Sequence, residues 1–238
     1  MVFSEADFSE NNTFLLSDWF SHTPQDVVAA NFRKTEAEIS QFPKDELYIF
    51  KANVPGPIAD VERPTPAGTV PAPFSFHMKD APVIESEAGR VRIVDVNNFP
   101  AAKTISAAFV EVEPGGMREL HWHPKAAEWQ FYIQGNARMS VFLSGGTART
   151  FDFEAGDVGI VPIVAGHYVQ NIGDETLIFV EIFKHPEYSD ISARKWLASN
   201  PVQIVADHLL STDVFVESLP VDDTPAPVIW YDQSKIQR

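Results

Sequence analysis

The sequence predicts a mainly β fold with a helical segment on either side of it. Three observations lead to this prediction: a series of short apolar segments separated by glycines, helix-start signals in the first and last parts of the chain, and a proline-dense stretch ahead of the strands. Evenly spaced short strands with turn signals are typical of a sandwich or barrel. We therefore expect one β-domain flanked by helices.

The first predicted element is a helical arm over residues 1–45. Thr23 precedes Pro24 at the start of PQDVVAANF, as an N-cap residue precedes a proline in the first turn of a helix. Thr35 and Glu38 then have the spacing of a capping box. Residues 46–73 follow as a predicted linker, because they are dense in proline, which suits neither a helix interior nor a central strand.

Residues 74–187 are predicted to form the β-domain. β-Branched and aromatic residues favour strands, and the glycines between the segments favour turns. The expected strands lie in RVRIVDV, TISAAFVEV, WQFYIQG, ARMSVFLSGG, TARTFDFEAG, DVGIVP, HYVQNIG and TLIFVEIF. Residues 188–238 form the last predicted segment, in which helix returns at ISARKWLAS and at PVQIVADHLL, where Pro201 stands in the first turn.

The two helical segments resemble one another in sequence. Residues 19–32 align without gaps on residues 196–209, with a tryptophan and a proline at the same spacing in both. Two amphipathic helices can share such a pattern by chance, but internal repeats usually mark a duplicated unit. Our interpretation is that the chain corresponds to the trailing part of a duplicated ancestor, with residues 1–45 as the remnant of a preceding domain.

Composition excludes several classes of function. The net charge is −15, from 18 basic and 33 acidic residues without a basic run, which argues against nucleic acids and anionic membranes as partners. The absence of cysteine excludes disulfides, thiolate ligands and a cysteine nucleophile. Residues 1–10 lack the features of a signal peptide, and no stretch approaches the roughly 20 apolar residues of a membrane span. We expect a soluble chain of unknown compartment.

Two histidine-bearing strand signals predict a single metal site. Successive side chains of a strand point to opposite faces, so His121 and His123 project together while Trp122 points away. Glu128 and His167 would arrive from neighbouring strands. Three nitrogens and one oxygen, with two positions left open, suit a redox-capable or Lewis-acidic first-row ion better than a closed zinc site. The signals run Gly115-x5-His121-Trp122-His123-x4-Glu128-x6-Gly135 and Gly156-x5-Pro162-x3-Gly166-His167-x3-Asn171. The remaining four histidines are interpreted as ordinary side chains.

These signals resemble the two motifs of the cupin family. The segments ARMSVFLSGGTARTFDFEAGDVGIVP and GHYVQNIGDETLIFVEIFK are similar to the second cupin of the two-domain oxalate decarboxylases. Residues 9–13 with FLLSDW resemble the lid loop and following helix of their first cupin, whose remaining part and metal ligands are missing here. Motif two reads Pro162-Ile-Val-Ala-Gly166-His167, a variant of Pro-x-Gly-x-x-His that the decarboxylases tolerate. The resemblance implies a cupin double-stranded β-helix, that is, a jelly-roll barrel.

The resemblance also implies a reaction. It implies manganese held by four ligands, oxalate or a similar small carboxylate at the open positions, dioxygen as co-catalyst, and formate and carbon dioxide as products. The ligands are His121, His123, Glu128 and His167. Harder ligands with open positions suit manganese, although affinity alone favours copper, nickel or zinc. The alternatives are an oxalate oxidase that releases hydrogen peroxide, a cupin that binds metal or carboxylate without turnover, and a storage or assembly module.

Four residues are candidates for catalytic roles. The guanidinium of Arg118 would fork onto a bound carboxylate, unless it forms a surface ion pair. Glu181 shares a strand face with three apolar side chains, which would raise its pKa and make it a general acid, unless it lies on an exposed edge. The resemblance adds Tyr188 as a hydrogen-bonding residue and Glu10 as the lid glutamate that donates a proton in the first cupin. Trp122 is interpreted as a packing residue rather than an electron carrier.

The helical arm predicts a homo-oligomer. An arm without its own β-domain would expose a set of apolar side chains too large to leave in water. We expect two chains to bury this surface, with the arm of one clasping the other and carrying Glu10 toward the neighbour's site. The apolar positions are Phe14, Leu15, Leu16, Trp19, Phe20, Val27 and Val28.

Overall fold

The computed structural model describes residues 15–45, 49, 51–60, 72–220, 225–232 and 234–235. The chain divides into two compact units, Met1–Thr69 and Val70–Arg238. Of the predicted site residues, only Glu10 lies outside the described part of the chain.

The first unit contains two short helices and a set of turns. Helix α1 spans Leu16–Ser21, α2 spans Gln25–Phe32, and the 3-10 turn η2 spans Ile58–Asp60. Val28 and Ala29 of α2 are buried against Ile39. The predicted capping box forms, since Thr35 N donates to Glu38 Oε2 over 2.8 Å. It closes a series of turns over residues 36–41 rather than a regular helix.

The expected N-cap at Thr23 is wrong. Pro24 itself occupies the cap position of α2, with an extended ψ of 132° and no side-chain cap. The Thr23 hydroxyl donates instead to Trp19 O over 2.7 Å, which closes the last turn of α1. A threonine hydroxyl between two helices can bond to either of them, and here it bonds back to the preceding one.

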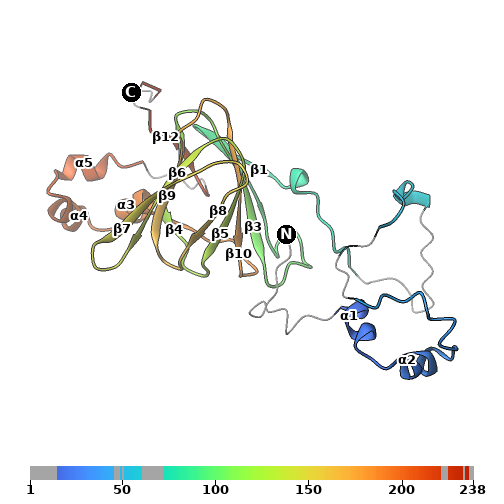
Figure 1. The fold of residues 1–238 in the computed structure, drawn as a ribbon. Coiled ribbons are helices and arrows are strands. Elements are labelled where there is room, and N and C mark those ends of the chain that lie inside the picture. Colours follow the sequence, from blue (N-terminus) through green and yellow to red (C-terminus); the bar gives the residue numbers. More distant parts are fainter. Residues whose placement is uncertain are drawn as a thin grey trace. The chain divides into compact units, whose positions relative to one another are not determined.

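The second unit consists of two facing antiparallel sheets (Figure 1). The first sheet contains, in spatial order, β1 (Val83–Ser86), β2 (Gly89–Val94), β3 (Ser106–Val112), β10 (Leu177–Phe183), β5 (Glu128–Gln134) and β8 (Val158–Val161). The second contains β11 (Ile191–Ser192), β4 (Gly116–Trp122), β9 (Gly166–Asn171), β6 (Ala137–Leu143) and β7 (Thr147–Phe153), with β12 (Val228–Trp230) also paired to β4. The 3-10 turn η3 (Met78–Asp80) precedes β1. This arrangement is the jelly roll that the sequence predicted.

The core lies between the two sheets because buried and outward side chains alternate along each central strand. In β10 every second residue from Leu177 to Phe183 is buried, and β3 has the same pattern. The core side chains come from both sheets and include Val91, Val110, Tyr132, Met139 and Phe179. All eight segments expected to form strands do so, whereas β1, β11 and β12 are strands of two to four residues that were not expected.

Three helices follow the sheets: α3 (Ala193–Ala198), α4 (Val202–Leu209) and α5 (Asp213–Glu217). The sequence repeat is also a repeat of structure. Pro201 caps α4 as Pro24 caps α2, and the residues that end the two helices, Leu210 and Arg33, are both left-handed. The paired tryptophans are equally exposed, Trp19 at 54% and Trp196 at 52%.

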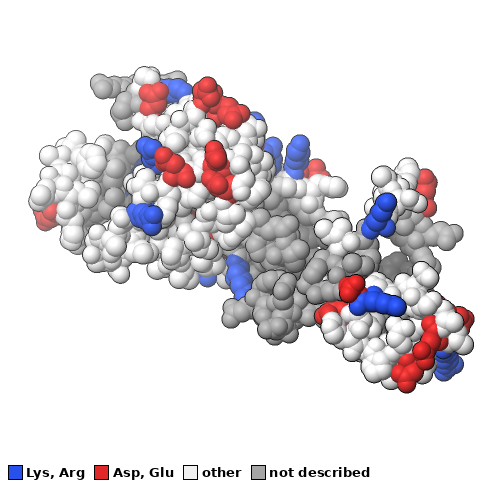
Figure 2. All heavy atoms as spheres, in the orientation of Figure 1, with Lys and Arg blue, Asp and Glu red and all other residues white. Residues whose placement is uncertain are grey.

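On the face shown in Figure 2, acidic and basic side chains lie interspersed among uncharged ones. In the described ranges no helix is long and apolar enough to cross a membrane.

Candidate metal centre

The four predicted ligands come together inside the sandwich. His121 on β4 lies in register with His167 on β9, Glu128 begins β5, and His123 follows the end of β4. Each is buried, at 1–3% exposure. One ligand atom from each lies within 4.8 Å of the others, which is the spread expected around a single ion.

Hydrogen bonds fix the tautomers of the three imidazoles. Nδ1 donates to Glu119 O in His121 (2.6 Å), to Ser189 O in His123 (2.9 Å) and to Ala165 O in His167 (3.0 Å). A carbonyl oxygen can only accept, so Nδ1 carries a proton, and in the neutral ring each Nε2 presents a lone pair. Backbone contacts of this kind orient metal-binding histidines.

The four candidate ligand atoms are not used in hydrogen bonds to the described residues. The three Nε2 atoms and Glu128 Oε2 are buried without a hydrogen-bond partner there. Glu128 Oε2 lies 2.8 Å from Nε2 of His167 and 3.0 Å from Nε2 of His123. Electron pairs at such distances repel, and leaving polar atoms unpaired in a core is costly. A cation between them removes both costs, so these residues fit a metal ion.

The charge states also favour a cation. Burial, followed by the charge of Arg118, lowers the pKa of His121 well below its usual range and keeps it neutral. Burial raises the pKa of Glu128, but the imidazoles of His167 and His123 outweigh it and hold that pKa well below its usual range. Burial lowers the pKa of His123, but the hydrogen bond and charge of Glu128 outweigh it and raise that pKa. The set is therefore anionic at Glu128 and neutral at His121, and a divalent metal would compete with a proton at His123.

A β-bulge brings Arg118 to the same side as the histidines. Arg118 and His121 are three residues apart, so strict alternation would turn them to opposite faces. The pairing of β4 with β9 shifts register between these two residues, and both side chains are buried. Trp122 points away, as expected, and its ring lies 6.0 Å from that of Trp196.

Arg118 is not the surface residue that was its alternative interpretation. Its side chain is fully buried, and Nη2 donates to Tyr188 Oη (3.1 Å) and to Asp190 Oδ2. Nη1 donates to Pro227 O over 3.4 Å. One nitrogen of the guanidinium that was expected to bind a carboxylate ligand is thus bound to Asp190 instead. The sequence does not predict Asp190 as a site residue, because it belongs to neither of the two histidine-bearing signals.

Glu181 lies on β10, between β3 and β5, and not on an edge. Burial first, and the charge of Glu128 next, raise its pKa to about 8, while Arg118 and His123 act in the opposite direction. Arg118 Nε is 3.9 Å from Glu181 Oε1, but its charge is directed to Asp190. Burial therefore dominates, and the carboxyl is protonated at neutral pH.

Residues 188–190 contact several of the predicted site residues. Tyr188 Oη donates to Glu181 Oε2 over 3.5 Å, and Ser189 O orients His123. Asp190 pairs with Arg118. One short segment thus contacts the predicted acid, a predicted ligand and the predicted guanidinium.

Two further core residues are linked to the ligand set by hydrogen bonds, one directly and one through the other. Gln130 Nε2 donates to Glu128 Oε1 over 2.6 Å, and Tyr132 Oη donates to Gln130 Oε1 over 2.7 Å. Both side chains are fully buried. The alternation of β5 could have found them, since they lie two and four residues after Glu128.

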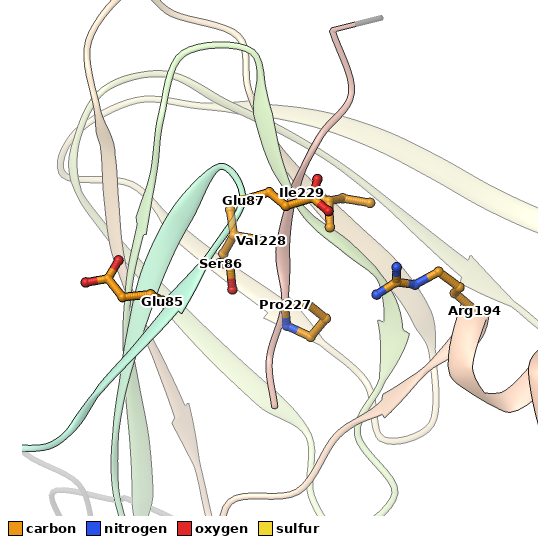
Figure 3. Close-up of a pocket in the computed structure, with 7 residues that line it drawn as sticks. All are labelled: Glu85, Ser86, Glu87, Arg194, Pro227, Val228 and Ile229. Carbon is orange, nitrogen blue, oxygen red and sulfur yellow. The ribbon is translucent and has the colours of Figure 1, made fainter. Parts of the chain in front are cut away.

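A surface cavity lies apart from this centre. It has a volume of about 370 Å³ and is lined by Glu85, Ser86, Glu87, Arg194, Pro227, Val228 and Ile229 (Figure 3). None of the four ligands lines it. Arg194 Nε lies 3.5 Å from Glu119 Oε2, which ties the helix α3 to β4.

The jelly roll and its three-histidine, one-carboxylate set define a metal-binding β-sandwich. The cupin family matches residues 76–213, and the chain belongs to this family. It is 52% identical to oxalate decarboxylase OxdC of Bacillus subtilis over 225 residues, which cover 94% of this chain and 58% of that protein. It is 41% identical to a probable oxalate decarboxylase of Arthroderma benhamiae over 210 residues, or 87% and 52% of the two chains.

Solved structures agree with this assignment. Oxalate decarboxylase of Lactobacillus farciminis, in complex with formate, has a TM-score of 0.83 and 59% identity over 90% of this chain and 63% of that one. The Bacillus subtilis oxalate decarboxylase, a protein with Mn(II) centres, has a TM-score of 0.85 and 51% identity over 94% and 59%. This chain spans less than two thirds of the length of each of these relatives.

Proposed function

We propose that the chain is a manganese-dependent cupin of the oxalate decarboxylase type, which converts oxalate to formate and carbon dioxide. The observation that carries this proposal is the position of a protonated, buried carboxyl, Glu181, beside an anionic three-histidine, one-carboxylate set. The relatives of similar sequence support it, since they are oxalate decarboxylases and one of them contains Mn(II).

The metal would be held by Nε2 of His121, His123 and His167 and by Oε2 of Glu128. Manganese bound there supplies a Lewis-acidic, redox-active centre with positions free for a small carboxylate. The backbone carbonyls that accept from the three Nδ1 atoms keep the rings aimed at one point, so binding requires little reorganisation.

Arg118 supplies the positive charge for the substrate. Its guanidinium is permanently charged, buried, and held in one orientation by Asp190 and Tyr188. In a buried site of low dielectric constant, such a charge stabilises an anion far more than it would in solvent. Nε of Arg118 is buried and has no hydrogen-bond partner in the described ranges, so it is the donor available to an oxalate oxygen.

Glu181 supplies the proton. Oxalate monoanion, HC2O4⁻, contains the atoms of one formate and one carbon dioxide, and loss of carbon dioxide leaves a carbon that must gain a proton. Glu181 would donate this proton, and the acidic proton of the monoanion would then return to Glu181, so that the acid is restored and the reaction balances. A carboxyl with a pKa near 8 is protonated at neutral pH and donates readily. Tyr188, hydrogen-bonded to Glu181 Oε2, orients the carboxyl and limits its access to bulk water.

Two other outcomes use the same residues. An oxalate oxidase would consume dioxygen and two protons and release two carbon dioxide molecules and hydrogen peroxide. A binding cupin would hold the metal and the carboxylate without turnover. Measuring formate and hydrogen peroxide from the manganese-loaded chain separates the three: formate supports the proposal, peroxide supports the oxidase, and neither product supports the binding protein.

We also propose that the chain forms a homo-oligomer. The exposed apolar side chains of the first unit include Trp19 at 54%, Val27 at 52% and Phe32 at 42%, whereas Val28, which was expected among them, is buried. The matching positions of the C-terminal repeat, Trp196, Ile204 and Leu209, are 52%, 53% and 46% exposed. Burying such side chains contributes about 1.5–3 kcal/mol each, which favours association.

A further inference from the structure

The two oxygens of Glu128 have different partners. Oε1 accepts a hydrogen bond from Gln130 Nε2 over 2.6 Å. Oε2 faces the imidazoles and has no hydrogen-bond partner within the described part of the chain. One carboxylate oxygen is therefore tied to the protein, and the other is left for a cation.

The direction of this contact is fixed by a second one. A carboxylate can only accept, so the amide nitrogen of Gln130 must face Glu128, and the amide oxygen faces away. That oxygen accepts from Tyr132 Oη over 2.7 Å. A tyrosine hydroxyl is a donor here, so Tyr132, Gln130 and Glu128 form a one-way relay along the inner face of β5.

The opposite strand leaves room for the relay. Gly159 on β8 lies directly across from Gln130. A Cβ at Gly159 would lie 2.6 Å from Gln130 Oε1 and 3.4 Å from Gln130 Cβ, so any larger residue would displace the amide. The glycine and the buried phenol thus both contact the amide of Gln130, and this amide holds one carboxylate oxygen of Glu128.

We infer that Gln130, oriented by Tyr132 and by the space at Gly159, is a positioning residue that keeps Glu128 bound to the metal through Oε2 alone. Oε1 is then withheld from the ion, and a coordination position stays free for a carboxylate ligand. A carboxylate that is free to rotate can offer both oxygens, which would occupy that position. The inference rests on the metal site of the proposed function and explains how three histidines and a glutamate avoid closing it.

The test is Mn(II) binding to the metal-free full chain, with no oxalate present. Replacing Gln130→Leu removes the amide at similar volume, and we expect Mn(II) affinity to fall by roughly 10- to 100-fold. The electron paramagnetic resonance spectrum of the remaining bound Mn(II) should also change, because Oε1 becomes available. Gly159→Ala should act in the same direction by displacing the amide, and Tyr132→Phe should have a smaller effect.

Gln134→Leu is the matched control. Gln134 lies on the same strand, and its Nε2 donates to Thr176 O over 3.0 Å, remote from the ligand set. Its loss should leave affinity and spectrum unchanged. If Gln130→Leu fails to fold, Tyr132→Phe and Gly159→Ala decide the question.

The outcomes separate this inference from the proposed function. Parent-like affinity and an unchanged spectrum in Gln130→Leu, or in both substitute variants, would overturn the inference alone. A parent chain that binds no Mn(II) would overturn the proposed function and this inference with it. Weakened binding and an altered spectrum, with Gln134→Leu unaffected, would support the inference.

Discussion

Arg118 and Asp190 form an ion pair inside the protein, beside the metal centre. Nη2 of Arg118 donates to Oδ2 of Asp190, and the two side chains are 0% and 12% exposed. A buried pair is costly to break because the remaining charge stays in the core without compensation. The pair therefore fixes the orientation of the guanidinium, and the stability of the fold depends on Asp190, which follows β10.

Replacing Asp190→Ala should lower the free energy of unfolding by about 3–5 kcal/mol, since it leaves the Arg118 charge unpaired. Chemical denaturation of the metal-free chain measures this change. The double variant Arg118→Met, Asp190→Ala should recover much of the loss. Asp152→Ala, which breaks the exposed pair with Arg138, is the control and should have a far smaller effect. Equal losses in the two aspartate variants would contradict the account.

Replacing His123→Ala should abolish stoichiometric metal binding. The parent should contain close to one manganese per chain, and the variant should lose it because one of four ligands is gone. His208→Ala, on the exposed face of α4, should keep the parent's metal content. Elemental analysis after expression with manganese and zinc both present checks this, and stoichiometric zinc without manganese would contradict the metal assignment.

The ionisation of Glu181 should make stability depend on pH. Its pKa rises from an ordinary 4.5 to about 8 in the fold, so between these values only the unfolded chain releases the proton. The folded state then binds more protons, and stability falls as pH rises. Relative to Glu181→Gln, the metal-free parent should lose at most about 1.4 kcal/mol per pH unit over this window. No difference is expected to develop below pH 4.5, and a parent that gains stability relative to the variant as pH rises would exclude a raised pKa.

Removing residues 1–45 should reduce the oligomeric mass, because the deletion removes the exposed apolar side chains of helices α1 and α2. Trp19→Ser should weaken association in the same direction, whereas Val54→Ser, at an exposed apolar position outside the helices, should not. Sedimentation over a range of concentrations measures both. A mass that the deletion leaves unchanged would show that the arm does not mediate assembly.

Strand alternation predicts from the sequence that His121 and His123 project together, and Glu181 follows from the apolar residues on its strand face. Alternation cannot place Glu128 and His167, which lie on neighbouring strands; the spacing of the two histidine-bearing signals adds them to the candidate ligand set. The same alternation argues against an inward Arg118. Only the bulge in β4 places it beside His121, and a bulge depends on pairing with β9, which a single strand does not specify.

Asp190 and the histidine tautomers lay beyond sequence reasoning for a related reason. Asp190 reaches Arg118 across 72 residues, and Ser189 reaches His123 across 66, through contacts that exist only once the sheets have packed. The sequence predicts Thr23 wrongly as a cap because its hydroxyl can bond either to the helix before it or to the helix after it, and the sequence does not decide between them. Gln130 could have been predicted from the sequence, since strand alternation puts it on the same face as Glu128.

The central claim is that Glu181 donates the proton in a manganese-dependent decarboxylation of oxalate. Nuclear magnetic resonance of ¹³C-labelled oxalate, added to the manganese-loaded chain and to Glu181→Gln at equal metal content, tests it most directly. We predict one formate for each oxalate consumed by the parent, and a loss of formate yield of at least about 100-fold in the variant with oxalate binding retained. Intact labelled oxalate without labelled formate in the parent, or equal formate from parent and variant, would contradict the account.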